Sequence, residues 1–258
     1  MTTEAIDPET KKRVAKGAGL VTLSAVTLGL IYGYDNGNIG GAALSFGPDL
    51  GLDTSQVEFV TAAIVWGEVI GALLGGWVSN RVGRKKAIIA VAAGYLIFCL
   101  TSALSFNETS LAASRFFLGL TIGLSLIAVP LFVAESVPAA VRGRTLVLYQ
   151  VMGVIGIILG NVFSATLSSA NPTYNWRLML GIAAVPALLL LPMLVRVPET
   201  PNWLMLKGRR KEATANLERI DPDVDVEAAI TEMQTTIDEE TGGGLGEMFR
   251  KPFLRATI

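Results

Sequence analysis

Six apolar stretches, separated by short charged segments, occupy the first three quarters of this 258-residue chain. They are residues 17–48, 59–80, 87–107, 109–134, 145–176 and 178–195. An α-helix needs about 20 residues to cross the roughly 30 Å hydrocarbon core of a bilayer, and each stretch is near or above that length. The fifth is too long for one crossing, and its Ser-Ser-Ala-Asn-Pro segment at 168–172 predicts a loop. The sequence therefore predicts an all-α polytopic membrane protein with six transmembrane helices.

The composition agrees with this class and excludes several functions. Hydrophobic residues make up 51% of the chain and charged residues 17%, whereas the net charge is −1. Without a positive field, we expect no nucleic-acid partner. The chain has no histidine, which removes imidazole bases and His-ligated metals. We predict no enzyme activity, cofactor or metal site, and we interpret the single cysteine, Cys99, as a buried small hydrophobe.

The positions of Lys and Arg predict the orientation, because these residues resist translocation across the membrane. With the amino terminus inside, 19 of the 21 basic residues fall on the cytoplasmic side. The two others are Arg115, within a stretch, and Arg177, at an outer helix start. We therefore expect a multi-pass protein of the cell (plasma) membrane with both termini cytoplasmic. A removable signal peptide is not expected, since the first stretch lacks a credible cleavage site.

The chain divides into three segments by this reasoning. Residues 1–16 form a cytoplasmic amino-terminal segment, and residues 17–195 form the six-helix transmembrane domain. Residues 196–258 are rich in charge and contain no apolar run long enough for a membrane span. Mixtures of Ala, Leu, Ile and charged residues at 212–220 and 226–237 predict short surface helices in this cytoplasmic linker.

Three charged residues lie inside the apolar stretches, where each costs at least ~2.5 kcal/mol on insertion. Asp35 lies late in an outward-running helix and Arg115 early in an inward-running one, so we expect them to pair at similar depth. The pair is either a structural tie between two helices or a carboxylate that takes up a proton when its arginine moves away. Glu68 has no obvious basic partner. It faces an aqueous cavity, is protonated, or forms a neutral hydrogen bond to a neighbouring helix.

Repetition and glycine content indicate how the helices pack. The first and fourth stretches occupy equivalent places in two three-helix halves, as in a 3+3 inverted repeat. Glycines within apolar helices predict close helix packing rather than nucleotide binding. They are Gly29, Gly33, Gly37, Gly40 and Gly41 in the first stretch and Gly153, Gly156 and Gly160 in the fifth.

Four motifs resemble those of a known family. They are Gly-Trp-Val-Ser-Asn-Arg-Val-Gly-Arg-Lys at 76–85, Tyr-Gly-Tyr-Asp at 32–35, Pro-Leu-Phe-Val-Ala-Glu-Ser-Val-Pro-Ala-Ala-Val-Arg-Gly-Arg at 130–144 and Pro-Glu-Thr-Pro-Asn-Trp-Leu at 198–204. The first resembles the signature loop of the major facilitator superfamily. Together they resemble the sugar porter family, which comprises bacterial proton–sugar symporters and facilitative glucose transporters. The resemblance covers residues 17–258 but only the amino-terminal half of the twelve-helix architecture.

The resemblance implies roles for individual residues. It makes Asp35 and Arg115 the proton-coupling pair, and Gln150, Ile157 and Tyr32 part of the sugar site. From the residues alone, Gln150 could simply bridge two helices, although an uncharged amide facing a cavity also suits a neutral hydroxylated ligand. The resemblance also implies a cytoplasmic gate, for which the alternative is ordinary anchoring at the membrane surface. The gate residues are Asn80, Arg81, Gly83, Arg84, Glu135, Arg142 and Glu199.

Some positions depart from the family pattern. Asn80 stands where many members carry aspartate, Asn202 replaces an arginine, and Glu68 stands where relatives have small or apolar residues. The chain also stops at residues 249–258, where a seventh helix is expected. We therefore expect it to be half of a transporter whose carboxy-terminal six-helix domain is absent.

The function implied is secondary active transport of a monosaccharide or polyol, by proton symport with alternating access. The expected partners are that solute, a proton, the lipid bilayer and the missing carboxy-terminal half. The alternative is a non-transporting sugar sensor or regulatory membrane protein on the same fold. The Asp35–Arg115 pair argues against a sensor, because sensing needs no proton coupling.

Overall fold

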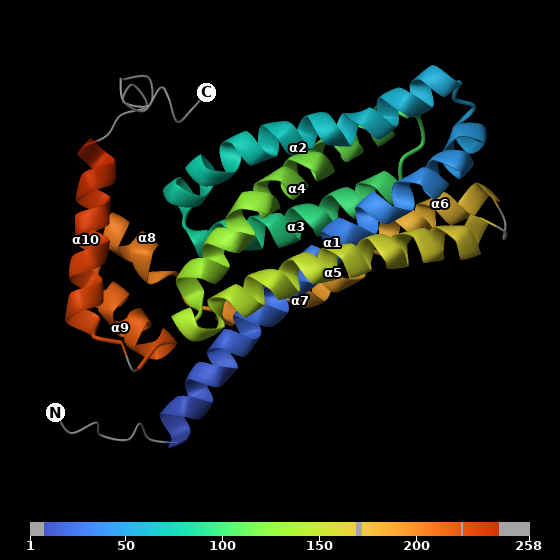
Figure 1. Ribbon diagram of the computed structural model, residues 1–258. Coiled ribbons are helices and arrows are strands. Elements are labelled where there is room, and N and C mark those ends of the chain that lie inside the picture. The colour runs from blue at the N-terminus through green and yellow to red at the C-terminus, as the bar shows by residue number, and fades with distance from the viewer. Residues whose placement is uncertain (1–7, 169–171, 223, 243–258) are drawn as a thin grey trace, which may run out of the picture.

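The chain is helical throughout the parts that the computed structural model describes, residues 8–168, 172–222 and 224–242. The helices are α1 (Pro8–Leu50), α2 (Thr54–Val82), α3 (Arg84–Ala103), α4 (Glu108–Ser136), α5 (Ala139–Ser168), α6 (Pro172–Gly181), α7 (Ala184–Arg196), α8 (Pro201–Leu206), α9 (Arg210–Ile220) and α10 (Val226–Gly242). Helices α1–α7 form an elongated bundle, and α8–α10 pack at one end of it (Figure 1). Six helical spans are long and apolar enough to cross a membrane. The predicted fold class is confirmed.

Short polar sequences end the helices and make the loops tight. The Asp53 side chain accepts from the Gln56 amide at 2.9 Å, and the Gln56 side chain accepts from the Asp53 amide, which is a capping box at the start of α2. Asn107 caps α4 in the same way through Ser110. Between α2 and α3, Gly83 has a φ of +105°, which only glycine adopts readily.

The sixth span differs from the prediction in its start and in its continuity. The loop predicted at 168–172 agrees with α5 ending at Ser168 and α6 beginning at Pro172, although residues 169–171 lie outside the described residues. The sixth span therefore begins before residue 178, the predicted start, and includes Trp176. That span is also two helices, separated by a turn at Ile182 and Ala183. Pro186 explains the break, because it has no N–H for the Ile182 carbonyl and its ring crowds that carbonyl.

Side chains from α1 satisfy the backbone that this break exposes. In a continuous helix the Met179 carbonyl would accept from the Ala183 amide. Instead it accepts from Asn38 Nδ2 at 2.9 Å and from the Tyr34 hydroxyl at 3.1 Å. Because hydrocarbon offers no other donors, the kink in the sixth span depends on these two residues.

Close glycine contacts hold α1 against α5 and α2 against α4, the two most extensive helix contacts of the bundle. A Cβ added to Gly33 or Gly37 of α1 would fall on the carbonyl oxygen of Gly153 or Ile157 in α5. Gly67 and Gly71 of α2 meet the α4 backbone in the same way. An inverted repeat equates α1 with α4 and α2 with α5, so it makes these two contacts equivalent.

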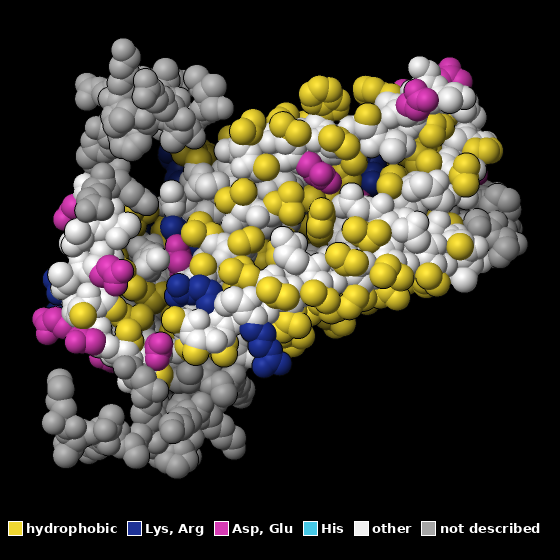
Figure 2. All heavy atoms as spheres, viewed as in Figure 1, with side chains coloured by type: hydrophobic (Ala, Val, Ile, Leu, Met, Phe, Trp, Pro, Cys, Tyr) yellow, Lys and Arg dark blue, Asp and Glu magenta, His cyan; other side chains and the backbone are white. Residues whose placement is uncertain are grey.

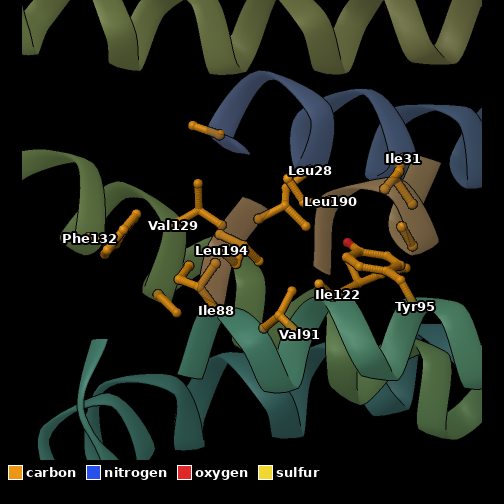
Figure 3. Packing of buried hydrophobic residues seen from close by; sticks show 14 of the residues in the cluster. Leu28, Ile31, Ile88, Val91, Tyr95, Ile122, Val129, Phe132, Leu190 and Leu194 are labelled. Atoms are coloured by element: carbon orange, nitrogen blue, oxygen red, sulfur yellow. The ribbon is translucent and has the colours of Figure 1, made fainter. Parts of the chain in front are cut away.

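Buried aliphatic and aromatic side chains fill the centre of the bundle. Figure 3 shows these side chains packed against one another. They are Leu28 and Ile31 of α1, Ile88, Val91 and Tyr95 of α3, Ile122, Val129 and Phe132 of α4, and Leu190 and Leu194 of α7. Large apolar residues also cover the outside, among them Trp66, Leu73 and Leu189, each more than half exposed. Figure 2 shows such side chains along the sides of the bundle. A surface of this kind is stable against lipid chains and unfavourable in water.

The glycine contacts give a direct test of the packing. Gly33→Ala should lower the free energy of unfolding by about 1–3 kcal/mol, because the added methyl must push the α5 backbone away. Gly40→Ala is the matched control on the same helix, since nothing lies within 4 Å of its Cβ position. The control should be neutral or slightly stabilising, as alanine favours helix. Thermal unfolding in detergent measures both, and equal unfolding temperatures for the two variants would contradict the packing described.

Candidate functional site

A buried ion pair links α1 to α4 in the middle of the bundle. Arg115 donates from Nη1 to Asp35 Oδ1 at 2.8 Å and from Nη2 to Asp35 Oδ2 at 3.1 Å. Both side chains are only 1% exposed. Two parallel N–H···O bonds of this kind are the strongest arrangement that arginine and carboxylate form. The predicted contact is confirmed, whereas its role in proton coupling stays a prediction.

Helix geometry explains why Asp35 points at α4. Each residue turns an α-helix by about 100°, so Asp35 lies on the side of α1 opposite to Gly33 and Gly37. Those glycines pack on α5, which leaves Asp35 facing Arg115. The Arg115 Nε has no acceptor within the described residues, so the guanidinium keeps one unused donor.

The residues predicted to line a sugar site lie on one face, formed by α1 and α5. Gln150 and Ile157 are exposed, and Tyr32 is partly buried. Gln150 and Ile157 are seven residues apart, which places them on one stripe of α5. A Cβ added to Gly153, between them, would lie 3.8 Å from the Tyr32 ring. Tyr32 therefore lies on the same side of the α1–α5 contact as Gln150.

Two further amides on this face were missed in the sequence. Asn36 of α1 and Asn161 of α5 are both exposed. Each donates through Nδ2 to the carbonyl one turn earlier, Asn36 to Tyr32 at 3.1 Å and Asn161 to Ile157 at 2.9 Å. No residue in the described part of the chain donates to their Oδ1 atoms, so both acceptors are open. The signal was present, since each asparagine follows a predicted site residue by four positions, one helical turn.

Glu68 lies beside the ion pair and shares none of its hydrogen bonds. It is partly buried on α2, where Gly123 of α4 packs against its backbone carbonyl. Its carboxyl group interacts electrostatically with Asp35, Arg115 and Tyr32. Within the described ranges it makes no hydrogen bond, so the interhelical bond considered for it is not formed there.

The predicted gate residues form two clusters where the bundle meets α8. Arg84 donates to Glu135 Oε1 from Nε at 3.2 Å and from Nη2 at 3.0 Å, and these side chains are 8% and 6% exposed. Glu199 Oε1 accepts from the backbone amides of Lys85 at 2.9 Å and Thr200 at 3.0 Å. The other Glu199 oxygen lies where a Cβ on residue 83 would be, so this contact also requires glycine.

The remaining gate residues are placed differently. The Asn80 carbonyl accepts from Trp203 Nε1 at 3.0 Å, a contact that the sequence did not indicate. The Arg81 guanidinium lies over the Trp77 ring, 5.3 Å from its centroid. Arg81 and Arg142 are exposed and form no ion pair with any described residue. The structure therefore assembles only part of the predicted network.

Comparison with known sequences and structures agrees with this geometry. Residues 21–257 match the family model described as Sugar (and other) transporter. The arabinose-proton symporter of Escherichia coli (strain K12) is 33% identical over 244 residues, 94% of this chain and 51% of that protein. The major myo-inositol transporter IolT of Bacillus subtilis (strain 168) is 35% identical over 216 residues, 82% of this chain and 46% of that protein.

A solved structure shares the arrangement of helices. The proton:xylose symporter XylE of E. coli, bound to 6-bromo-6-deoxy-D-glucose, superimposes with a TM-score of 0.79 at 29% identity. The match covers 89% of this chain and 55% of that one. The chain thus spans about half the length of the curated relatives it matches. From the family match and the shared fold, this chain belongs to the sugar transporter family of the major facilitator superfamily.

Proposed function

We propose that this chain is the amino-terminal six-helix domain of a proton-coupled transporter for a monosaccharide or polyol. In this proposal residues 1–16 and 196–258 are cytoplasmic, and a second six-helix half completes the solute pathway. The buried Asp35–Arg115 pair is the observation that carries the proposal. The relatives' names support it, since they include symporters for arabinose and xylose and a myo-inositol transporter.

The pair supplies a physical route from proton binding to movement. While Asp35 is charged, Arg115 is fully compensated and α1 is held to α4. Protonation of Asp35 leaves a guanidinium in the bundle interior without a counter-charge, which is strongly unfavourable. An arrangement in which Arg115 meets another acceptor then gains in population. Glu68 is the nearby carboxylate that can take this role.

The α1–α5 face suits a neutral, hydroxyl-rich solute. Gln150, Asn36 and Asn161 offer uncharged amides, each able to accept or donate, and Tyr32 adds a hydroxyl. Ile157 offers an apolar contact for the C–H faces of a sugar ring. This face is one wall of the proposed site, and the second half of the transporter provides the other.

The Arg84–Glu135 and Glu199 clusters act in this proposal as the inner gate. Arg84 Nη1 and Glu135 Oε2 are buried and have no partner in the described structure. In this pair, both partners keep an atom that can still form a hydrogen bond. The pair can therefore gain hydrogen bonds when the second half closes against this domain and lose them when the second half moves away. Such a contact can hold the closed gate and still break in every cycle.

Asp35→Asn tests proton coupling in a full-length transporter that carries this domain. We expect loss of proton-driven sugar accumulation with counterflow retained, because only the titratable group is removed and the amide still accepts from Arg115. Uptake of labelled sugar into proteoliposomes, with and without a proton gradient, measures both activities. Glu58→Gln is the matched control, an exposed carboxyl at the far end of α2. Uphill uptake by Asp35→Asn equal to wild type would refute the coupling role.

Gln150→Ala tests the solute site. Sugar binding should weaken by about 1–3 kcal/mol, the loss expected when hydroxyl groups in a desolvated site lose an amide partner. Leu159→Ala is the control, because Leu159 is exposed on the opposite side of α5. Calorimetric titration with xylose, arabinose and myo-inositol gives the affinities. If Gln150→Ala binds the preferred solute as wild type does, the assignment of Gln150 to the solute site is refuted.

A further inference from the structure

A cavity of about 900 Å³ lies where α9 packs beside the first part of α1. Helices α3 and α7 also reach it, through Lys85 and Arg196. Figure 1 shows α9 at the end of the bundle, near the start of α1. This α1–α9 cavity is separate from the α1–α5 face and contains none of the proposed solute-binding residues.

The cavity lies at the level where membrane spans begin and end. Gly17 begins the first span, Arg84 the third, and Arg196 ends the sixth. Gly17, Lys85 and Arg196 all line the cavity. Because charged residues at helix ends mark the headgroup region, the cavity opens beside lipid headgroups rather than in the hydrocarbon core. Two residues close in sequence to the cavity lining are exposed as lipid-contacting residues are. Leu23, two positions after Val21, is 48% exposed, and Val195, directly before Arg196, is 61% exposed.

Basic groups with unused donors line this cavity. Arg196 and Arg219 are exposed, and neither side chain has a hydrogen bond or ion pair with any residue that the structure describes. Lys85 Nζ donates to the Val195 carbonyl at 2.8 Å, which leaves two of its three N–H groups. Two acidic residues, Glu199 and Glu218, also line the cavity. Three basic against two acidic side chains leave a net charge of +1 in the lining, and backbone amides already occupy one Glu199 carboxylate oxygen.

A buried hydroxyl gives a second, independent indication of a ligand. Ser136 lines the cavity, is only 7% exposed, and its Oγ has no hydrogen-bond partner in the described structure. A buried hydroxyl without a partner is costly, so such groups in proteins generally meet a ligand or water. Ser136 lines the same cavity as the three basic side chains.

We propose that the α1–α9 cavity binds a phosphate group, held by Lys85, Arg196 and Arg219 with Ser136 as a further donor. An anionic phospholipid headgroup and a soluble phosphate ester offer this same chemistry. The position at the headgroup level and the apolar α1 wall, Leu20 and Val21, favour the phospholipid. The site contains none of the proposed solute-binding residues, but it shares Glu199 and Lys85 with the proposed inner gate.

The test measures ligand binding to the 258-residue chain in a neutral detergent. Thermal stabilisation is titrated with dioctanoyl phosphatidylglycerol, dioctanoyl phosphatidylcholine, glycerol 1-phosphate and inorganic phosphate. Arg196→Gln combined with Arg219→Gln removes two donors, and Ser136→Ala removes the buried hydroxyl. The matched control is Arg210→Gln combined with Lys211→Gln, which removes the same charge from exposed positions at the other end of α9.

We expect saturable stabilisation by phosphatidylglycerol, weakened at least about tenfold in the Arg196/Arg219 variant and unchanged in the control. Ser136→Ala, whose fold should be intact, is expected to weaken binding less. Equal stabilisation by inorganic phosphate or glycerol 1-phosphate would support the phosphate site and overturn its assignment to lipid. Phosphatidylglycerol binding that is absent, or that survives the Arg196/Arg219 substitutions, would overturn the proposal.

Discussion

The ion pair between Asp35 and Arg115 joins the two helices that correspond to each other in the repeat, α1 and α4. Both side chains are 1% exposed, so neither group is in contact with water that could replace its partner. Removing one member of such a pair typically costs 3–5 kcal/mol, because the other charge stays buried. The ion pair therefore stabilises the centre of the bundle when both charges are present. It strongly destabilises the bundle when only one of them is present. That property distinguishes it from the apolar contacts around it.

The geometry of this pair depends on how closely the neighbouring helices approach. Lipid chains are as apolar as leucine, so helices in a membrane gain little from burying apolar surface against each other. Close backbone contacts hold the helices together instead. Gly33 and Gly37 of α1 contact α5, and Gly67 and Gly71 of α2 contact α4. These contacts fix the rotation of each helix about its axis. With α1 held in this rotation, the Asp35 side chain points toward Arg115 of α4.

The number of spans and the ion pair could be predicted from the sequence alone, because apolar length and charge depth are local or nearly local properties. It could not show the break in the sixth span. Pro186 was visible, but whether the helix bends or stops there depends on Asn38 and Tyr34, which come from α1 and are far away in sequence. The contact between Trp203 and Asn80 likewise depends on how α8 docks on the bundle. Such contacts between distant segments leave no periodic signal.

Adjacent residues of α1 serve the two parts of the proposed site. Asp35 is buried against Arg115, whereas Asn36, about 100° further around the helix, is exposed on the solute face beside Tyr32. A rigid helix cannot turn one of these residues without turning the other. In the proposed mechanism, a solute that draws Tyr32 and Asn36 toward itself therefore shifts Asp35 relative to Arg115, and protonation of Asp35 shifts the solute face in return. Thermodynamic reciprocity requires both effects to have the same coupling free energy. One turn of α1 is thus enough to connect proton binding and sugar binding in this mechanism.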